Sequence, residues 1–272
     1  MWSFAKGHGT QNDFILVKDR HGMLHPGEAD IRYLCDRHAG IGADGVLRVV
    51  KAGSVPAWRG DPDLWFMDYR NCDGSVAEMC GNGLRVFVRY LLEENLVGGA
   101  EIQIATRAGL RRAAVLADGR IRVEMGQVTT TGTVSLTYQS SNVTGVGVDV
   151  GNPHLVVELS PDQVNHADLN TWPQPDPAQF PHGANVELVA RGDDGFTMRV
   201  RERGVGETRS CGTGAVAAAW VLANGAAGNH RVRLPGGTVE VLFDEQGQAW
   251  LTGPAVIVAR GEVALPEPER DH

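Results

Sequence analysis

The stretch Arg209–Ala219, RSCGTGAVAAA, places a cysteine and two glycines immediately before a run of small apolar residues. Glycine permits a tight turn and a close approach of the backbone to a small ligand. The first N–H groups of a helix have no partner inside the helix, and the helix dipole makes that end positive. An anion binds well there, and a thiol held there loses its proton more easily. The stretch therefore predicts a cysteine at a helix start, which is either chemically activated or a buried structural residue.

The same arrangement occurs once more, earlier in the chain. Residues 79–88, MCGNGLRVFV, again place C-G-x-G before an apolar pattern with the i, i+3, i+4 spacing of a helix face. Two copies of this arrangement are harder to explain than one as cysteines that are buried only for packing. The second copy therefore favours a functional interpretation of Cys80 and Cys211.

Other segments also recur in the same order in both halves of the chain. Asn12–Val17 resembles Asn152–Val157, and Gly42–Asp44 resembles Gly183–Asn185. Together with the cysteine motif, these two segments make three ordered matches, which indicate an internal duplication. We therefore expect two halves that share a fold and pack about a pseudo-twofold axis, with the two cysteines facing each other across the cleft between the halves.

Composition restricts the class of protein. The chain has 272 residues, enough for two domains with a core each, and its 25 basic and 33 acidic residues give a net charge of −8. This balance argues against nucleic acid or an anionic membrane as a partner. The first residues show no signal pattern, and the apolar run 215–223 is too short to span a bilayer, so we expect a cytoplasmic protein.

The four cysteines are too few for a disulfide framework in a chain of this length. They also lack the short spacings of a zinc site, so we expect no metal. We interpret Cys35, which lies in an apolar helical pattern, and Cys72 as structural residues.

Most of the remaining chain has the alternation of strands, for example at 101–104, 121–125 and 196–200, and 231–241 is typical of a hairpin with a glycine turn. We therefore predict an α+β fold in which each half is an antiparallel sheet curled around one or two helices.

The turn 117–119 suggests a division into residues 1–118, joined by 255–272, and residues 119–254. The segment 215–222 is apolar on all sides, which predicts a helix buried on every side and ending near Asn224.

Two opposed cysteines suggest a specific reaction. One thiolate removes a proton from a carbon next to a carboxylate, while the other thiol delivers a proton to the opposite face. The stereocentre inverts without redox change, and the scheme requires no cofactor because the helix N–H groups stabilise the negative charge on the carboxylate. His154 and Glu202 are candidates for setting the protonation of the thiols, although a turn histidine and a surface glutamate are the plainer interpretations.

The chain closely resembles the diaminopimelate epimerase family. The matching segments are KGHGTQNDF (6–14), GIGADGV, MDYRNCDGSVAEMCGNGLR, VGNPH, GANVE and RERGVGETRSCGTGAVAAA. The resemblance implies a pseudo-symmetric pair of domains with the active site in the cleft between them, conversion of LL- to meso-diaminopimelate for lysine and peptidoglycan precursors, and no pyridoxal phosphate. It implies Cys80 and Cys211 as the acid/base pair, assisted by His154 and Glu202. Substrate contacts would fall on Asn12, Asn71, Gly81, Asn82, Asn152, Asn185, Glu202, Arg203, Gly212 and Thr213.

The sequence departs from the family pattern at Gly45, where many members have glutamine, so that substrate contact is not carried over. The glycine-to-asparagine spacing before Asn12 is also one residue longer than elsewhere. Family members are often dimers, and the resemblance therefore implies a homodimer.

Three other interpretations remain open. A proline-racemase-like enzyme would use the same cysteine pair, but proline has no distal ammonium and carboxylate for the asparagines and Arg203 to hold. A thiol–disulfide redox protein would need a thiol exposed to partner proteins. A binding module with structural cysteines would keep its affinity when the cysteines were replaced.

Overall fold

The computed structural model describes residues 1–138, 141–173 and 175–266. The chain divides into two compact units. The first unit contains residues 1–9, 13–121 and the C-terminal segment from Ala255, whose residues 267–272 lie outside the described part. The second unit contains residues 122–254 together with Thr10–Asn12.

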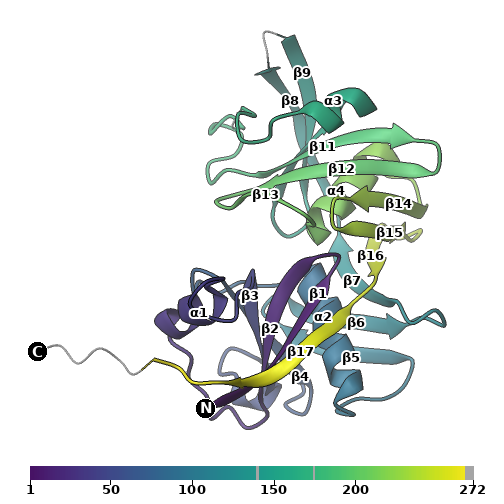
Figure 1. The fold of residues 1–272 in the computed structure, drawn as a ribbon. Coiled ribbons are helices and arrows are strands. Elements are labelled where there is room, and N and C mark those ends of the chain that lie inside the picture. Colours follow the sequence, from purple (N-terminus) through teal and green to yellow (C-terminus); the bar gives the residue numbers. More distant parts are fainter. Residues whose placement is uncertain (139–140, 174, 267–272) are drawn as a thin grey trace, which may run out of the picture. The chain divides into compact units, whose positions relative to one another are not determined.

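The elements of the first unit are nearly all strands around one long helix (Figure 1). In chain order they are β1 (Trp2–Gly9), β2 (Asn12–Asp19), α1 (Glu28–Cys35), β3 (Gly45–Lys51), the 3₁₀ turn η1 (Ala52–Ser54), β4 (Trp65–Asn71), α2 (Gly81–Glu93), β5 (Glu101–Thr106), β6 (Gly109–Val115) and β17 (Val256–Val263).

The second unit has the same composition. Its elements are β7 (Ile121–Gln127), β8 (Thr129–Tyr138), β9 (Ser141–Asp149), β10 (Pro153–Glu158), α3 (Pro161–His166), β11 (Asn185–Gly192), β12 (Gly195–Glu202), β13 (Gly206–Thr208), α4 (Gly212–Leu222), β14 (Gly228–Leu234), β15 (Gly237–Phe243) and β16 (Gln248–Gly253).

Strand pairing repeats from one unit to the other. In the first unit β2–β3 is parallel, β3–β4 antiparallel, β4–β5 parallel and β5–β6 antiparallel. In the second unit β10–β11, β11–β12, β12–β14 and β14–β15 follow the same sequence of directions. The duplication predicted from the sequence is therefore confirmed as a repeated α+β fold.

The predicted α+β class holds, but the expectation of an antiparallel sheet in each unit needs a correction, because each sheet also contains parallel neighbours. Parallel neighbours cannot be joined by a tight turn and need a crossover connection. Helix α1 lies in the connection between β2 and β3, and α3 lies in the connection between β10 and β11. Helix α2 likewise lies between β4 and β5, and α4 between the parallel strands β12 and β14.

The two long helices form the centres of their units. Helix α4 packs against strands β9, β10, β11, β12, β14, β15 and β16, and its residues from Ala215 to Ala219 are fully buried. These residues match the prediction from the apolar sequence, whereas Trp220 and Val221, inside the segment predicted to be buried on every side, are only half-buried. The helix ends where Asn224 and Gly225 adopt left-handed backbone conformations, with φ of 51° and 69°. Met67 in β4 and Met198 in β12, which are separated by the same number of residues as Cys80 and Cys211, are both fully buried.

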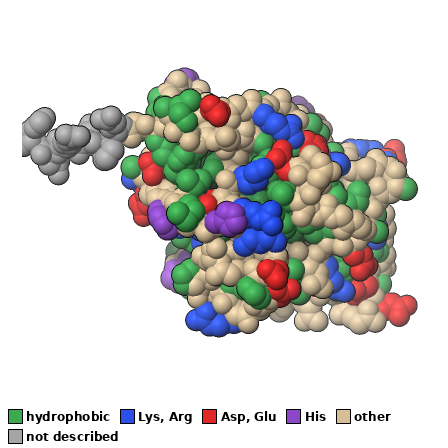
Figure 2. Space-filling view, turned by 90° about the horizontal axis from the view of Figure 1, so that it is seen from below, with side chains coloured by type: hydrophobic (Ala, Val, Ile, Leu, Met, Phe, Trp, Pro, Cys, Tyr) green, Lys and Arg blue, Asp and Glu red, His purple; other side chains and the backbone are tan. Residues whose placement is uncertain are grey.

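The surface carries both signs of charge. Figure 2 shows one face of the molecule, on which basic, acidic and hydrophobic side chains are interspersed. Within the described part of the chain, every helix is too short or too polar to cross a membrane.

Candidate active site

Cys80 caps the N-terminus of α2. Its backbone is extended, with φ −143° and ψ 123°, and its Sγ accepts a hydrogen bond from the Gly83 backbone nitrogen at 3.4 Å. An N-cap side chain that accepts from the third helical residue satisfies one of the unpaired donors of the first turn. The sulfur therefore lies at the positive end of the helix, where the thiolate form is stabilised.

Cys211 occupies the equivalent position on α4. Its φ is −123° and its ψ 119°, and its Sγ accepts from the Gly214 backbone nitrogen at 3.3 Å. The Thr213 hydroxyl lies 3.5 Å from the same sulfur. The two C-G-x-G motifs thus produce the same local structure, as the sequence predicted, because the backbone N–H of the third helical residue has no partner inside the helix and reaches the capping sulfur.

The electrostatic surroundings of the two thiols differ. Arg85 in α2 is completely buried, and burial lowers the pKa of its guanidinium to about 10, while the nearby Cys80 acts in the opposite direction. Its Nη2 donates to Asn82 Oδ1 at 2.9 Å. Beside Cys80 there is therefore a buried cation that also holds a predicted substrate residue.

Cys211 lies instead near carboxylates. Burial raises the pKa of its thiol well above the ordinary 9.0, and the negative charges of Glu202 and Glu187 raise it further, whereas the Thr213 and Gly214 hydrogen bonds lower it. The thiol form is favoured at this position. The two cysteine caps, each in its own unit, thus combine one backbone geometry with opposite neighbouring charges.

His154 is fully buried in β10 and is held from both sides. Its Nδ1 lies 2.7 Å from Glu187 Oε1, and its Nε2 lies 3.0 Å from Asn152 Oδ1. Glu187, in β11, is also fully buried. Sequence reasoning did not select Glu187, although a carboxylate inside the otherwise apolar segment Val186–Ala190 is a signal for a paired, functional group.

Asn185, Glu202 and Arg203 come together at neighbouring strand ends of the second unit. Asn185 Oδ1 accepts from the Arg203 backbone nitrogen at 2.9 Å, and the Thr208 hydroxyl donates to Glu202 Oε1. The Arg203 guanidinium donates to the His182 carbonyl at 3.1 Å. Glu202 and Arg203 also line a hollow of about 320 Å³ in this unit.

Asn12 groups with the second unit as part of the short segment Thr10–Asn12. Thr10 and Gln11 adopt left-handed conformations, with φ of 52° and 64°, and Thr10 Oγ1 lies 2.8 Å from Ser210 Oγ, next to Cys211. The Arg209 guanidinium donates to Gln11 Oε1 at 2.7 Å.

Asn71 belongs to the first unit, where it ends β4 opposite Gly45 of β3. Its Nδ2 donates to Ser75 Oγ at 3.0 Å. Gly81 and Asn82 form the first turn of α2, and both are buried. The structure therefore distributes the predicted residues over two groups: Asn71, Cys80, Gly81 and Asn82 in the first unit, and Asn12, Asn152, His154, Asn185, Glu202, Arg203, Cys211, Gly212 and Thr213 in the second.

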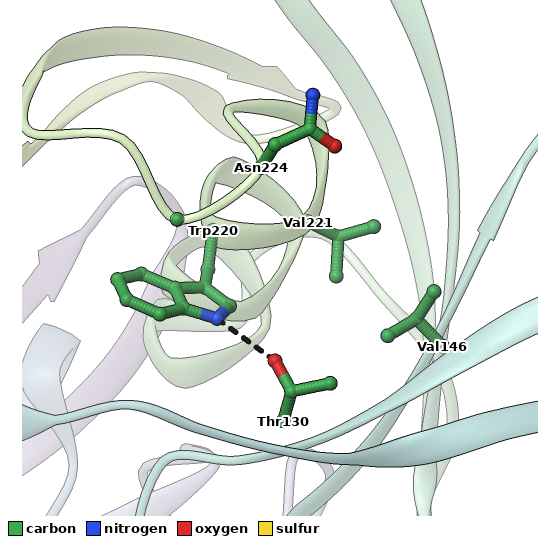
Figure 3. A pocket seen from close by; sticks show the side chains of 6 residues that line it. Thr130, Val146, Trp220, Val221 and Asn224 are labelled. Atoms are coloured by element: carbon green, nitrogen blue, oxygen red, sulfur yellow. Dashed lines mark hydrogen bonds between the residues drawn. The ribbon is translucent and has the colours of Figure 1, made fainter.

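A second pocket of this unit lies away from these residues, at the opposite end of α4. It measures about 340 Å³ and is lined by Thr130, Val146, Trp220, Val221, Asn224 and Gly225 (Figure 3). Trp220 Nε1 donates to Thr130 Oγ1 at 3.1 Å. At 1.5 Å per residue, Trp220 lies roughly 13 Å along the helix from the cysteine cap, and the pocket has no titratable side chain among its lining residues. Among the described residues, no group of three or more His, Cys, Asp or Glu side chains is arranged to hold a metal ion.

Comparison with known proteins finds relatives that match nearly the whole chain. The family model described as diaminopimelate epimerase matches residues 4–131 and 146–263. The diaminopimelate epimerase of Corynebacterium glutamicum strain R is 50% identical over 273 residues, covering 96% of this chain and 98% of that protein. The diaminopimelate epimerase of Thermobifida fusca is 49% identical over 270 residues, with the same coverage.

Solved structures share the fold at low sequence identity. A PhzF-family phenazine biosynthesis protein of Bacillus anthracis superposes with a TM-score of 0.71 at 17% identity, covering 97% of this chain and 99% of that one. A probable proline racemase of Agrobacterium radiobacter K84 also has a TM-score of 0.71 at 17% identity, covering 98% and 94%.

Proposed function

The chain belongs to the diaminopimelate epimerase family, which makes it an isomerase-type enzyme, and from this premise we propose that it converts LL-diaminopimelate to meso-diaminopimelate without a cofactor. In the proposed mechanism Cys80 and Cys211 are the proton-transferring groups, and they act on opposite faces of one α carbon.

The observation that carries this proposal is the matched pair of cysteine caps. Each sulfur accepts a hydrogen bond from the third residue of the central helix of its unit, at 3.4 Å for Cys80 and 3.3 Å for Cys211. A structural cysteine has no need of this geometry in both repeats. A thiol that must exchange a proton benefits from it, because the helix end stabilises the thiolate and leaves further N–H groups for a carboxylate.

The different surroundings of Cys80 and Cys211 support different protonation states of the two thiols before the reaction begins. The buried guanidinium of Arg85 favours negative charge near Cys80, and the carboxylates of Glu202 and Glu187 disfavour it at Cys211. We therefore propose that the resting enzyme holds a Cys80 thiolate and a Cys211 thiol. Cys80 then removes the α proton of one isomer, and Cys211 delivers a proton to the other face.

The remaining residues are proposed to hold the substrate. Backbone N–H groups of Gly81, Asn82, Gly212 and Thr213 would receive the carboxylate next to the reacting carbon and stabilise the charge that develops there. Asparagine amides both donate and accept, so Asn12, Asn71, Asn152 and Asn185 suit an ammonium and a carboxylate together. Arg203 would hold the distal carboxylate in a bidentate contact, and Glu202 the distal ammonium.

The test uses isotope incorporation. The reduced protein is incubated with LL-diaminopimelate in heavy water, with no pyridoxal phosphate or metal added, and the stereoisomers are separated. Formation of the meso isomer with one α-deuteron is expected. Absence of both inversion and exchange in a protein with confirmed free thiols would overturn the proposal. Proline in a parallel incubation is expected to remain unchanged, since it lacks the distal groups.

The family membership also suggests a biological setting. We propose that the enzyme acts in the cytoplasm as a homodimer and supplies meso-diaminopimelate for lysine and peptidoglycan precursors. Sedimentation equilibrium at micromolar concentration tests the dimer, and a mass of one chain would contradict it.

A further inference from the structure

The fully buried pair His154–Glu187 has a feature that the cysteine mechanism does not use. Glu187 Oε1 lies 2.7 Å from His154 Nδ1, and both side chains have no exposed surface. Glu187 Oε2 is also buried and has no hydrogen-bond partner among the described residues. Burying a carboxylate is costly unless it serves a partner, so this geometry indicates a specific task for the Oε1 contact.

The contact restricts where the histidine carries its proton. A carboxylate can only accept hydrogen bonds, so the proton between the two groups belongs to His154 Nδ1. The second ring nitrogen, Nε2, lies 3.0 Å from Asn152 Oδ1, which accepts a proton carried by Nε2; for an unprotonated Nε2 the Asn152 amide turns over so that its Nδ2 donates. Asn152 is one of the residues proposed to contact substrate. With Nδ1 occupied by its proton, Nε2 is the atom of His154 that can gain or lose a proton on the substrate side.

Glu187 is also packed against the first turn of α4. A Cβ added to Gly214 would lie 2.6 Å from Glu187 Oε1 and 3.3 Å from Cys211 Sγ. The glycine of the second C-G-x-G motif therefore leaves room for the carboxylate as well as for the capping sulfur. The equivalent Gly83 has no such neighbour, since a Cβ there would meet Phe14, Cys80 and Leu47 at 3.4 to 3.5 Å. The carboxylate belongs to the Cys211 half alone.

We propose that Glu187 is a positioning residue for the proposed epimerase reaction: it holds the proton of His154 on Nδ1 and so presents Nε2, on the side of Asn152, as the proton-exchanging nitrogen of His154. The catalytic consequence of this inference rests on the proposed function. The position of the proton on His154 does not depend on any substrate. It places Glu187 behind His154, in contact with the histidine ring and with the first turn of α4.

The test measures which ring nitrogen of His154 carries the proton. Nitrogen-15 NMR of the wild-type protein, with His154 assigned by comparison with H154N, is expected to show a protonated Nδ1. Glu187→Met keeps the volume and removes the acceptor, so the proton is expected to move to Nε2, where Asn152 Oδ1 can accept it. Glu187→Gln retains an accepting oxygen and is expected to preserve the wild-type proton position.

The kcat values with diaminopimelate should separate the variants as the NMR measurement does, with E187Q close to wild type and E187M apart from both. In a serine-protease triad a wrong histidine tautomer lowers kcat by about 10⁴, and loss of a group that orients a metal-ligating histidine costs about 10- to 100-fold. We expect E187M to lose at least about tenfold in kcat with KM changed less than about threefold, and E187Q to recover most of that loss.

Asp68→Asn provides a matched control for stability. Asp68 is a buried carboxylate of the first unit, paired with Arg48 at 2.9 Å and with Arg107 at 2.6 Å. D68N is expected to lower the melting temperature as E187M does, without altering the His154 resonances.

An unprotonated Nδ1 in the wild type overturns the proposal even if no variant folds. A wild-type kcat in E187M overturns it as well. If the wild-type protein shows a protonated Nδ1 but no epimerisation, the proposed function fails while the assignment of the proton stands.

Discussion

The Tyr69 ring lies where a side chain at Gly45 would have to go. A Cβ at position 45 would meet Tyr69 Cε2 at 2.7 Å and the Arg70 carbonyl oxygen at 2.6 Å. Tyr69 is itself fixed by an edge-to-face contact with Phe14, with ring centroids 5.8 Å apart. The glutamine that many family members have at this position would therefore not fit on this backbone, and the aromatic ring of Tyr69 occupies the space instead.

Gly45→Ala is expected to destabilise the protein by about 1–3 kcal/mol, because the clash is partly with a backbone carbonyl that cannot rotate away. Urea denaturation measures the change. Gly98→Ala is the matched control, since a Cβ at Gly98 meets no atom within 4 Å, and its free energy of unfolding should stay within about 0.5 kcal/mol of wild type. Equal stability of G45A and G98A would contradict the steric explanation.

Replacing either cysteine cap should abolish most of the activity. Cys80→Ala and Cys211→Ala each remove one of two non-equivalent proton-transfer groups, so each alone is expected to lower kcat by at least about 10²-fold. Initial rates of meso-diaminopimelate formation are the measurement. Cys72→Ala serves as the control because Cys72 is exposed and lies outside the proposed machinery. Retention of activity in either cap variant would favour the binding-module interpretation.

Alkaline pH should weaken the first unit through Cys35. Burial raises the pKa of this thiol from its ordinary 9.0 to about 12, with Cys72 as a smaller cause. The folded chain then keeps a proton that the unfolded chain loses, so the stabilisation is complete below pH 9 and is lost as the pH rises toward 12. A serine hydroxyl does not titrate in this range.

Cys35→Ser should therefore reduce the dependence of stability on pH. Between about pH 8 and about pH 10.5 the free energy of unfolding is expected to fall more steeply for wild type than for C35S. Urea denaturation at the two pH values gives both slopes. Parallel slopes would mean that the Cys35 thiol does not contribute.

Arg203 offers a test of substrate recognition. If it holds the distal carboxylate, Arg203→Ala should lower kcat/KM for diaminopimelate by on the order of 10²-fold, because a charge-assisted bidentate contact is lost. Arg191→Ala is the control. Arg191 lies on β11 of the same unit and forms an exposed ion pair with Glu158 at 2.8 Å, which contributes little. Similar kinetics for the two variants would remove Arg203 from the binding residues.

Local sequence alone determined much of this protein. Each C-G-x-G motif encodes its cysteine cap within four residues, and the uniformly apolar segment after Cys211 encodes a helix that must be buried. The ordered recurrence of short segments predicted a repeated α+β fold, and the repeated strand pairing confirms it. These features depend on neighbours in the chain, so a local pattern is sufficient to reveal them.

Tertiary structure alone decided the rest. The parallel pairing of β2 with β3 and of β10 with β11 depends on which strands become neighbours after a crossover, which alternation cannot encode. The grouping of Thr10–Asn12 with the second unit joins residues 200 positions apart, as in the contact of Thr10 with Ser210. The pairing of His154 with Glu187 likewise arises because β10 and β11 lie side by side. A partner across a sheet is set by the global strand order and leaves no periodic mark in the chain.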